Sequence, residues 1–199
     1  ADFTKPVVCS ISSRGGKSVA CFRIEVAAHA CAQYTDVDGH WARKEICTAT
    51  ELGLMNGMST TTFVPEGTMT RAMLVMILYR AAGAEAKGSS TFTDVRKDAW
   101  YADAVAWAQQ EKIVDGVGGN RFAPEAPVTR EQLATILWRY AGGQKGAKAP
   151  ESFADCGSIS AWAADAMAWA VEQGVIKGMS SNRLAPQGTA TRAQAATML

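Results

Sequence analysis

The stretch Phe122–Gln132, which reads FAPEAPVTREQ, decides the fold because the chain carries it three times. Residues 63–73 read FVPEGTMTRAM and residues 184–194 read LAPQGTATRAQ, so an apolar residue, a proline and a Thr-Arg pair recur in the same order. The arginines of these pairs lie 59 and 62 residues apart, and the prolines keep the same two offsets. Several markers held in phase predict a three-unit repeat.

Each unit has a predicted helix on either side of this stretch. The first helix follows a tryptophan (Trp41, Trp100 or Trp162) and carries an apolar stripe at i, i+4 and i+7. The stripes are Ala42, Ile46 and Ala49, then Tyr101, Val105 and Ala108, then Ala163, Met167 and Ala170. The second helix begins at each Thr-Arg pair, and its inner side is formed by Leu74, Val75, Ile77 and Leu78, by Leu133, Ala134, Ile136 and Leu137, and by Ala195, Ala196, Met198 and Leu199. We expect the Phe/Leu-x-Pro segment before it to be extended, because a residue that precedes proline avoids the helical region.

A pair of helices in about 50 residues cannot bury its apolar face alone, whereas three pairs can close on one another. We therefore expect a mainly α fold, in which three helix-loop-helix repeats at residues 34–87, 88–148 and 149–199 form a pseudo-threefold body. The third repeat is about a turn shorter than the others, which indicates the natural chain end or a truncation. Glycines that keep the repeat offsets are expected to supply a positive φ or a close backbone approach, and they are Gly57, Gly116 and Gly178.

Residues 1–33 stand outside the repeat and read as a short N-terminal β-hairpin, or as the remnant of a preceding domain. On a hairpin centred near Gly15, Cys9 and Cys21 would lie opposite each other and could form a disulfide. A register slip of one residue would separate them. The chain has five cysteines, no C-x-x-C pair and two histidines, so a zinc site is not expected and at least one thiol is free or intermolecular.

Composition excludes several classes of protein. The formal net charge of +1 argues against a nucleic-acid binder that works through its overall field. No apolar run reaches the length of about 18 residues that a membrane span needs. The N-terminus lacks the features of a signal peptide, so the chain is cytosolic, already processed, or excised from something larger. His40 has no catalytic constellation near it in sequence and the glutamates are scattered, so neither an enzyme nor a cofactor is expected.

The Thr-Arg pairs supply the candidate functional residues. Their threonines are predicted N-caps, with a glutamine completing a capping box in units two and three where Met73 cannot, and they are Thr70, Thr129 and Thr191. The arginines sit where the helix dipole disfavours a cation by roughly 0.3–1 kcal/mol, and they are Arg71, Arg130 and Arg192. Each would bind either the aspartate of its own or a neighbouring unit, or the carboxylate of a ligand.

Two further sets keep the repeat spacing. Each unit opens with an aromatic residue, one further residue and an aspartate, and the aspartates are Asp36, Asp94 and Asp155. These carboxylates would orient the arginines or cap the loop before the first helix. The tryptophans Trp41, Trp100 and Trp162 would serve as core anchors or as platforms on which sugar rings stack.

The linked markers closely resemble the S-layer homology repeat, three of which commonly sit together in surface proteins of bacteria, and the resemblance covers residues 34–199. It implies a compact pseudo-trimer whose grooves between repeats bind secondary cell-wall polysaccharide, often pyruvylated and therefore anionic. The family's Thr-Arg-Ala-Glu signature corresponds to residues 70–73, 129–132 and 191–194. None keeps the terminal glutamate, and unit one departs most.

The resemblance and the residues together predict a secreted, non-catalytic module at the bacterial cell surface or cell wall, which anchors a protein by binding this polysaccharide. The arginine, aspartate, tryptophan and threonine sets above are its expected contacts. The alternative is a protein-interaction or surface scaffold that has lost saccharide binding, with the N-terminal segment as a contact for a protein partner. The absent glutamates, the divergent first unit and the cysteines favour this alternative.

Overall fold

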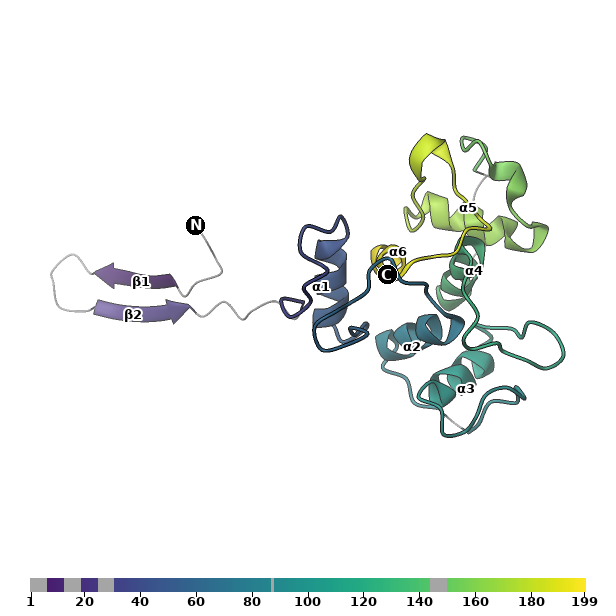
Figure 1. Cartoon of the computed structure of the whole chain (residues 1–199), viewed down its shortest axis with the longest axis horizontal. Helices are drawn as coiled ribbons and strands as arrows, with labels where there is room; N and C mark the ends of the chain where they lie inside the picture. Colours follow the sequence, from purple (N-terminus) through teal and green to yellow (C-terminus); the bar gives the residue numbers. More distant parts are fainter. Residues whose placement is uncertain (1–6, 13–18, 25–30, 87, 144–149) are drawn as a thin grey trace.

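The computed structural model describes the backbone of residues 7–12 and 19–24, and all of residues 31–86, 88–143 and 150–199. Within these ranges the fold is mainly helical, with two α-helices in each repeat (Figure 1). The helices are α1 (Arg43–Glu51), α2 (Arg71–Ala81), α3 (Ala102–Gln110), α4 (Arg130–Tyr140), α5 (Ala164–Glu172) and α6 (Arg192–Met198). Short 3₁₀ turns in the third repeat are η1 (Cys156–Ser158), η2 (Ala161–Ala163) and η3 (Ser180–Asn182). The predicted helix pairs are confirmed.

The second helix of each repeat begins where the sequence predicts, at the Thr-Arg pair. The hydroxyl of Thr70, Thr129 or Thr191 accepts a hydrogen bond from the backbone N–H three residues later. In α4 and α6 the glutamine at that third position also accepts from the threonine N–H and completes a capping box. Met73 occupies the same position in α2 and leaves the box open.

The three repeats close into a ring because each second helix packs against the first helix of the next repeat. The helix α2 contacts α3, α4 contacts α5, and α6 returns to α1 (Figure 1). Main-chain bridges follow the same order, joining Thr70 to Pro127, Thr129 to Thr189 and Thr191 to Thr68. The pseudo-threefold helical body is therefore confirmed.

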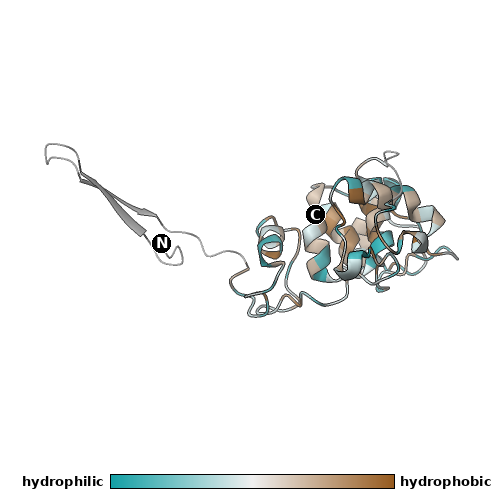
Figure 2. Ribbon diagram, turned by 90° about the horizontal axis from the view of Figure 1, so that it is seen from above, coloured by the Kyte–Doolittle hydropathy of each residue, from teal (hydrophilic) through white to brown (hydrophobic). Residues whose placement is uncertain are grey.

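One apolar core joins all three repeats. Every residue of the three predicted stripes on α1, α3 and α5 is 9% exposed or less. These residues and the inner sides of α2, α4 and α6 belong to a single cluster, and Figure 2 shows apolar residues along the packed helices. One assignment is wrong, because Leu199 is 46% exposed. It follows the last residue of α6 and lies outside the packed face of that helix.

The recurring glycines allow a close approach and do not supply a positive φ. Their φ angles lie outside the left-handed region at Gly57, Gly116 and Gly178. A Cβ at any of them would lie 3.0 Å or less from an aromatic ring, that of Tyr34, Phe92 or Phe153 respectively. These rings open the repeats, so each glycine lets the start of its repeat pack onto the loop after the first helix.

The Phe/Leu-x-Pro segment is not extended at its middle residue. Val64, Ala123 and Ala185 have φ angles of 60°, 56° and 49°. Such angles cost a residue other than glycine on the order of 1–3 kcal/mol. The cost is offset because two successive backbone N–H groups there donate to one aspartate, as at Asp36, which accepts from Phe63 and Val64 at 2.8 and 2.7 Å. Tertiary hydrogen bonds thus override the local preference of a residue before proline.

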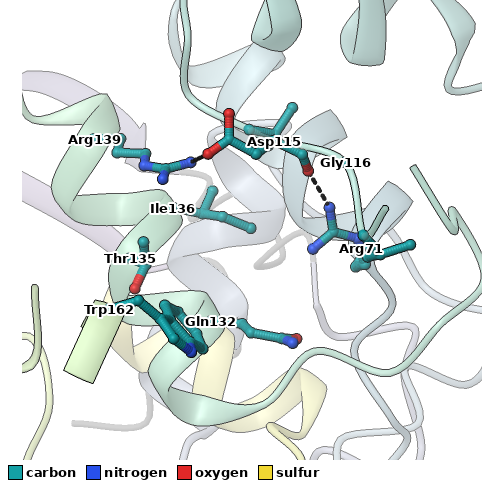
Figure 3. A pocket seen from close by; sticks show the side chains of 10 residues that line it. Arg71, Asp115, Gly116, Gln132, Thr135, Ile136, Arg139 and Trp162 are labelled. Atoms are coloured by element: carbon teal, nitrogen blue, oxygen red, sulfur yellow. Dashed lines mark hydrogen bonds and ion pairs between the residues drawn. The ribbon is translucent and has the colours of Figure 1, made fainter. Parts of the chain in front are cut away.

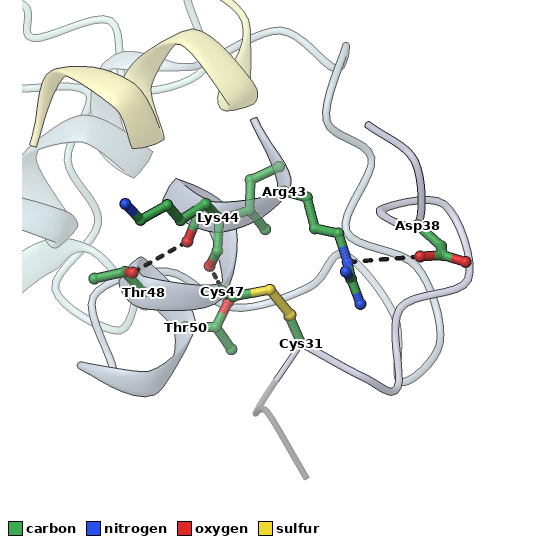
Figure 4. The surroundings of a disulfide bond; sticks show 8 residues. Cys31, Asp38, Arg43, Lys44, Cys47, Thr48 and Thr50 are labelled. Atoms are coloured by element: carbon green, nitrogen blue, oxygen red, sulfur yellow. Dashed lines mark hydrogen bonds and ion pairs between the residues drawn. A yellow bond between two sulfur atoms is a disulfide. The ribbon is translucent and has the colours of Figure 1, made fainter. Parts of the chain in front are cut away.

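The N-terminal strands β1 (Val7–Ser12) and β2 (Val19–Ile24) form the predicted antiparallel hairpin. Their register pairs Cys9 with Phe22 and Cys21 with Ser10, so the expected disulfide lacks the directly opposed pair that it needs. The side chains of both cysteines lie outside the described residues. The described chain contains a different disulfide, which we did not predict, between Cys31 and Cys47 (Figure 4).

Candidate functional site

The arginines of the Thr-Arg pairs join neighbouring repeats. Arg71 is 6% exposed, and from the start of α2 its side chain reaches into the second repeat. Its Nε donates to the carbonyl of Phe122 at 2.7 Å and its Nη2 donates to the carbonyl of Asp115 at 2.9 Å. Both acceptors are backbone groups, so this contact depends on the path of the partner chain and not on its side chains.

The same two bonds recur at the other junctions. Arg130 donates to the carbonyls of Leu184 and Lys177, at 2.7 and 3.2 Å. Arg192 donates to the carbonyls of Phe63 and Asn56, at 3.0 and 2.6 Å, and so closes the third repeat onto the first. We call this pair of bonds the arginine staple.

Burial lowers the pKa of all three guanidinium groups from its ordinary value, and nearby carboxylates oppose that shift in each case. Two of the groups also lie over an aromatic ring. The Cζ of Arg71 is 4.7 Å from the centroid of the Phe122 ring, and that of Arg192 is 4.4 Å from the Phe63 ring. Cation–π contacts of this kind help a buried cation to remain charged.

The aspartates bind backbone N–H groups of the same Phe/Leu-x-Pro loops whose carbonyls bind the arginines. Asp94 accepts from the N–H groups of Phe122 and Ala123, both at 2.8 Å. Burial alone would raise the pKa of Asp94, but these two hydrogen bonds outweigh it and the net pKa is lowered. Asp36 and Asp155 bind the corresponding N–H groups of their own repeats and also have lowered pKa values.

Arginine and aspartate are therefore linked by hydrogen bonds to the backbone of one shared residue, and not by an ion pair. Phe122 donates its N–H to Asp94 and accepts at its carbonyl from Arg71. Phe63 and Leu184 are bound in the same way at the other two junctions. Among the described residues, none of the three arginines forms the expected ion pair with these aspartates, and the aspartates do not cap the loop before the first helix.

A cavity opens beside each staple, and we name each cavity after its arginine. The Arg71 groove encloses about 450 Å³ and is lined by Arg71, Val114, Asp115, Gly116, Val117, Gln132, Thr135, Ile136, Arg139 and Trp162 (Figure 3). The Arg192 groove encloses about 420 Å³ and is lined by Leu54, Met55, Asn56, Gly57, Met58, Met73, Met76, Ile77, Arg80, Trp100, Glu125 and Arg192. The Arg130 groove encloses about 460 Å³ and is lined by Trp41, Glu45, Arg130, Val175, Lys177, Gly178, Met179, Ser180, Gln194, Thr197 and Met198.

Every groove takes parts from all three repeats. One repeat supplies the arginine, the next supplies the glycine loop and second helix, and the third supplies the tryptophan. The tryptophans are not core anchors, because Trp41, Trp100 and Trp162 are 62%, 56% and 57% exposed. Packing in the core therefore does not account for three large exposed rings at equivalent cavities.

The structure brings arginine and tryptophan together in each groove and leaves the other two sets outside its lining. The threonines use their hydroxyls as helix caps. The aspartates use their carboxylates on the Phe/Leu-x-Pro loops, one residue away from the staple. Both sets therefore shape the grooves without facing them.

Sequence reasoning did not assign four lining positions to the site. The fourth residue of the signature faces the groove as Gln132, Gln194 or Met73. A turn further along the helix lies Thr135, Thr197 or Met76, and Arg139 and Arg80 follow. The residue just before each recurring glycine also lines its groove, as Asp115, Asn56 or Lys177. All keep the repeat offsets, so alignment of the three units could have found them.

Neither a metal site nor a membrane helix is found in the described part of the chain. No group of three or more histidine, cysteine, aspartate or glutamate side chains there could hold a metal ion. No helix within the described ranges combines the length and the apolar content that crossing a membrane requires.

Comparison with protein families identifies the repeat. The S-layer homology domain model matches the chain three times, at residues 33–72, 91–134 and 152–196. Each match contains one aromatic-x-Asp opening, the tryptophan that precedes the first helix and one Thr-Arg pair.

Several bacterial proteins are similar to most of this chain. An exoglucanase XynX of Acetivibrio thermocellus is 35% identical over 83% of the chain, and an amylopullulanase of Thermoanaerobacterium thermosulfurigenes is 32% identical over 83%. A surface-layer 125 kDa protein of Lysinibacillus sphaericus is 34% identical over 76% of the chain. The chain spans only 16%, 9% and 13% of the lengths of these relatives.

Proposed function

The chain belongs to the S-layer homology domain family, and from this premise we propose that its three grooves bind secondary cell-wall polysaccharide and so hold a protein to the bacterial cell wall. The module is non-catalytic in this proposal, and any enzymatic activity belongs to other domains of the proteins that carry such repeats. Its place is the cell surface, as the surface-layer relatives indicate.

The shape and chemistry of the grooves support a saccharide. Each groove offers the face of an exposed tryptophan, on which the apolar C–H face of a sugar ring can stack. Hydrogen-bonding side chains line the same cavity as the ring, such as Gln132 and Arg139 in the Arg71 groove (Figure 3). A guanidinium group borders every groove, and guanidinium groups bind carboxylates with two parallel hydrogen bonds. The single observation that carries the proposal is the threefold recurrence of an exposed tryptophan beside a buried arginine.

The staple limits what the arginines can give to a ligand. Nε and Nη2 of each arginine already donate to backbone carbonyls, so only the remaining N–H groups on Nη1 and Nη2 can donate to a ligand, and Nη1 of Arg130 also donates to Gln194. An acidic sugar such as a pyruvylated residue would therefore need a second cation, and Arg139, Arg80 or Lys177 lines the respective groove. The finer proposal is that the polymer is anionic and that its acidic residue binds in a groove where both cations are available to it.

Calorimetric titration with a pyruvylated secondary cell-wall polysaccharide tests this function. The chain should give saturable heat, and Trp41→Ala, Trp100→Ala and Trp162→Ala should each weaken the groove concerned by about threefold to tenfold. Polymer from which the pyruvate has been removed should bind more weakly. Absence of heat with both polymers would reject the proposal, and undiminished binding by the triple variant would reject the grooves as its site.

Tryptophan variants are preferred to arginine variants because the rings are exposed and the arginines hold the ring of repeats together. Loss of binding after removal of Arg130 would not distinguish a lost contact from a lost fold. Leu52→Ala is a matched control, since Leu52 is 66% exposed at the end of α1 and lies outside the lining of the three grooves. It should bind the polymer as the parent chain does.

A protein ligand is the second candidate, and the lining of the Arg192 groove favours it there. Met58, Met73 and Met76 place flexible thioethers in this groove, and such side chains adapt to varied apolar partners. Wall sacculi stripped of protein by protease separate the two functions. If the stripped sacculi still sediment the chain, the polysaccharide is the ligand, and if they no longer do, the partner is a protein.

A further inference from the structure

The three grooves share one backbone position whose side chain differs in charge. Nη2 of each stapling arginine donates to the carbonyl of the residue just before the recurring glycine. That residue is Asp115 in the Arg71 groove, Lys177 in the Arg130 groove and Asn56 in the Arg192 groove. All three residues are exposed and line their grooves. The staple therefore places a carboxylate, an ammonium and an amide at equivalent points.

We infer that this position sets the charge preference of each groove, so that the grooves bind different segments of one polymer. Lys177 makes the Arg130 groove selective for an acidic sugar, and Asp115 makes the Arg71 groove selective for a neutral one. Asn56 leaves the Arg192 groove without a preference from this position. The inference rests on the proposed function, because it assumes that the grooves bind saccharide.

In the Arg71 groove, the second cation is Arg139, and it already forms an ion pair with Asp115. Its Oδ2 lies 2.7 Å from Nη1 of Arg139, and Figure 3 shows this pair across the groove. Arg139 is 32% exposed and Asp115 is 73% exposed, so an entering carboxylate would meet the acid before the base. The carboxylate of the ligand would have to displace Asp115 from Arg139 and would then lie close to the negative charge of Asp115, which is unfavourable. The hydroxyl groups of a neutral sugar carry no such penalty and can accept from Arg139 or donate to Asp115.

In the Arg130 groove, the equivalent side chain is itself a cation. Within residues 31–86, 88–143 and 150–199, no carboxylate lies within 4.0 Å of the Lys177 ammonium, so this charge is available to a ligand. Glu45 of α1 also lines the groove, and its negative charge disfavours an anionic ligand there. Lys177 is therefore needed to offset Glu45, and its loss should change the preference of this groove strongly.

In the Arg192 groove, the position carries no charge. The amide of Asn56 neither occupies nor repels the nearby Arg80, which donates instead to the carbonyl of Leu54 at 3.2 Å. Glu125 lines the same groove. This groove supplies the neutral reference between the other two.

The test exchanges the two charged side chains and measures each groove separately. The indole N–H signals of Trp162 and Trp41 in NMR spectra report the Arg71 and Arg130 grooves respectively. The probes are one oligosaccharide with its pyruvate ketal and the same oligosaccharide without it. In the parent chain the ratio of affinities, acidic over neutral, should be higher at Trp41 than at Trp162. Asp115→Lys should raise the ratio at Trp162 by about fivefold to tenfold, and Lys177→Asp should lower it at Trp41 by a similar factor.

Matched controls change the same charges away from the grooves. Glu172→Lys at the end of α5 repeats the change of Asp115→Lys, and Lys97→Asp in the loop before α3 repeats that of Lys177→Asp. Both positions are exposed and outside the three linings, so both ratios should stay within twofold of the parent values. Ratios that also stay within twofold in the exchanged variants, while both sugars still bind, would overturn this inference alone. Absence of any shift with either sugar would overturn the proposed function together with it.

Discussion

The Arg130 and Arg192 grooves are built by the same hydrogen bonds and lined by different chemistry. In both, Nε and Nη2 of the arginine donate to two carbonyls of the next repeat. Nη1 of Arg130 donates to Oε1 of Gln194 at 3.3 Å, whereas Nη1 of Arg192 faces Sδ of Met73 at 4.0 Å. The comparison teaches that closure of the ring and the chemistry of the groove depend on different atoms of one side chain. The lining can therefore change from repeat to repeat while the fold is kept.

The difference between Gln194 and Met73 also affects how the two helices that line these grooves are capped. Gln194 closes the capping box of α6, whereas Met73 leaves that of α2 open. Repeat 1 carries a disulfide on α1 that the other described repeats lack, because Ala106 and Ala168 stand where it has Cys47. The first repeat thus differs from its siblings in cap, covalent link and groove lining, and shares with them the staple.

Removing a staple should have the largest effect, and it should be similar in both grooves. Arg130→Ala and Arg192→Ala each leave two carbonyls without a charged donor, which should cost about 2–5 kcal/mol of the free energy of unfolding. For a chain of this size the midpoint of thermal unfolding should fall by roughly 5–15 °C. Urea and thermal unfolding followed by circular dichroism measure both values.

Arg121→Ala is the control for that prediction. Arg121 is exposed and lies 3.7 Å from Asp94, so its removal should change the free energy of unfolding by less than about 1 kcal/mol. If Arg130→Ala were no less stable than Arg121→Ala, the staple would not hold the repeats together. A large difference between Arg130→Ala and Arg192→Ala would show instead that Gln194 contributes to closure.

The repeat, its helices and its core could be predicted from the sequence because they follow from local patterns. Apolar stripes with helical spacing placed α1, α3 and α5, and the Thr-Arg pairs placed the starts of α2, α4 and α6. The capping boxes at Thr129 and Thr191 and the open one at Thr70 are confirmed, since a cap involves residues three positions apart. The tryptophans and arginines of the predicted site do line grooves.

The partners of those residues could not be predicted, because they come from distant parts of the chain. Arg192 bonds to Phe63, and no pattern within one repeat reveals that its acceptor is a backbone carbonyl of another. The positive φ of Val64 likewise depends on Asp36, so a rule about residues before proline gave the wrong conformation. The Cys31–Cys47 disulfide spans the boundary between the N-terminal segment and the first repeat.

Removing the Cys31–Cys47 disulfide should have the second largest effect on stability, and it should weaken binding in one groove and not in another. It closes a loop with a sequence separation of 16, and its loss should cost about 3 kcal/mol. Because Trp41 lies just before α1 and Glu45 lies on it, binding to the Arg130 groove should weaken while the Arg71 groove is unaffected. The double variant Cys31→Ser/Cys47→Ser, measured by unfolding and by the Trp41 and Trp162 signals, tests this expectation. Cys156→Ser serves as the control, and equal weakening of both grooves would contradict a local role for α1.

Acid should destabilise all three repeats alike, through the aspartates that hold the Phe/Leu-x-Pro loops. Their pKa values are lower in the folded chain than the ordinary value near 4, so the unfolded chain takes up protons first as the pH falls. The stability from these carboxylates is present above pH of about 4 and is lost as the pH falls through the lower folded pKa values. Unfolding measured from pH 7 to pH 2.5 should show this loss.

The corresponding amide variants separate the carboxylates from other acidic groups. Asp36→Asn and Asp155→Asn should each cost about 1–2 kcal/mol at pH 7, because the two N–H groups bind different carboxylate oxygens and the amide replaces one of these with an NH2 donor. Each variant should also lose less stability than the parent chain between pH 5 and pH 2.5. A pH profile unchanged by both substitutions would assign the acid sensitivity to other groups.

Exchanging methionine and glutamine at the fourth position of the signature should have the smallest effect on stability. Met73→Gln should make the lining of the Arg192 groove resemble that of the Arg130 groove. Met73→Gln can close the capping box at Thr70 and offer Oε1 to Nη1 of Arg192, as Gln194 does to Arg130. The free energy of unfolding should rise by about 0.5–1 kcal/mol, and Gln194→Met should lower it by a similar amount. Denaturant titration of both variants measures this difference, and binding to the Arg192 groove should become stronger for polysaccharide and weaker for apolar peptides. If Met73→Gln were less stable than the parent chain, packing of the thioether in the groove would outweigh the cap, and the methionines would be there to fill space and not to select a ligand.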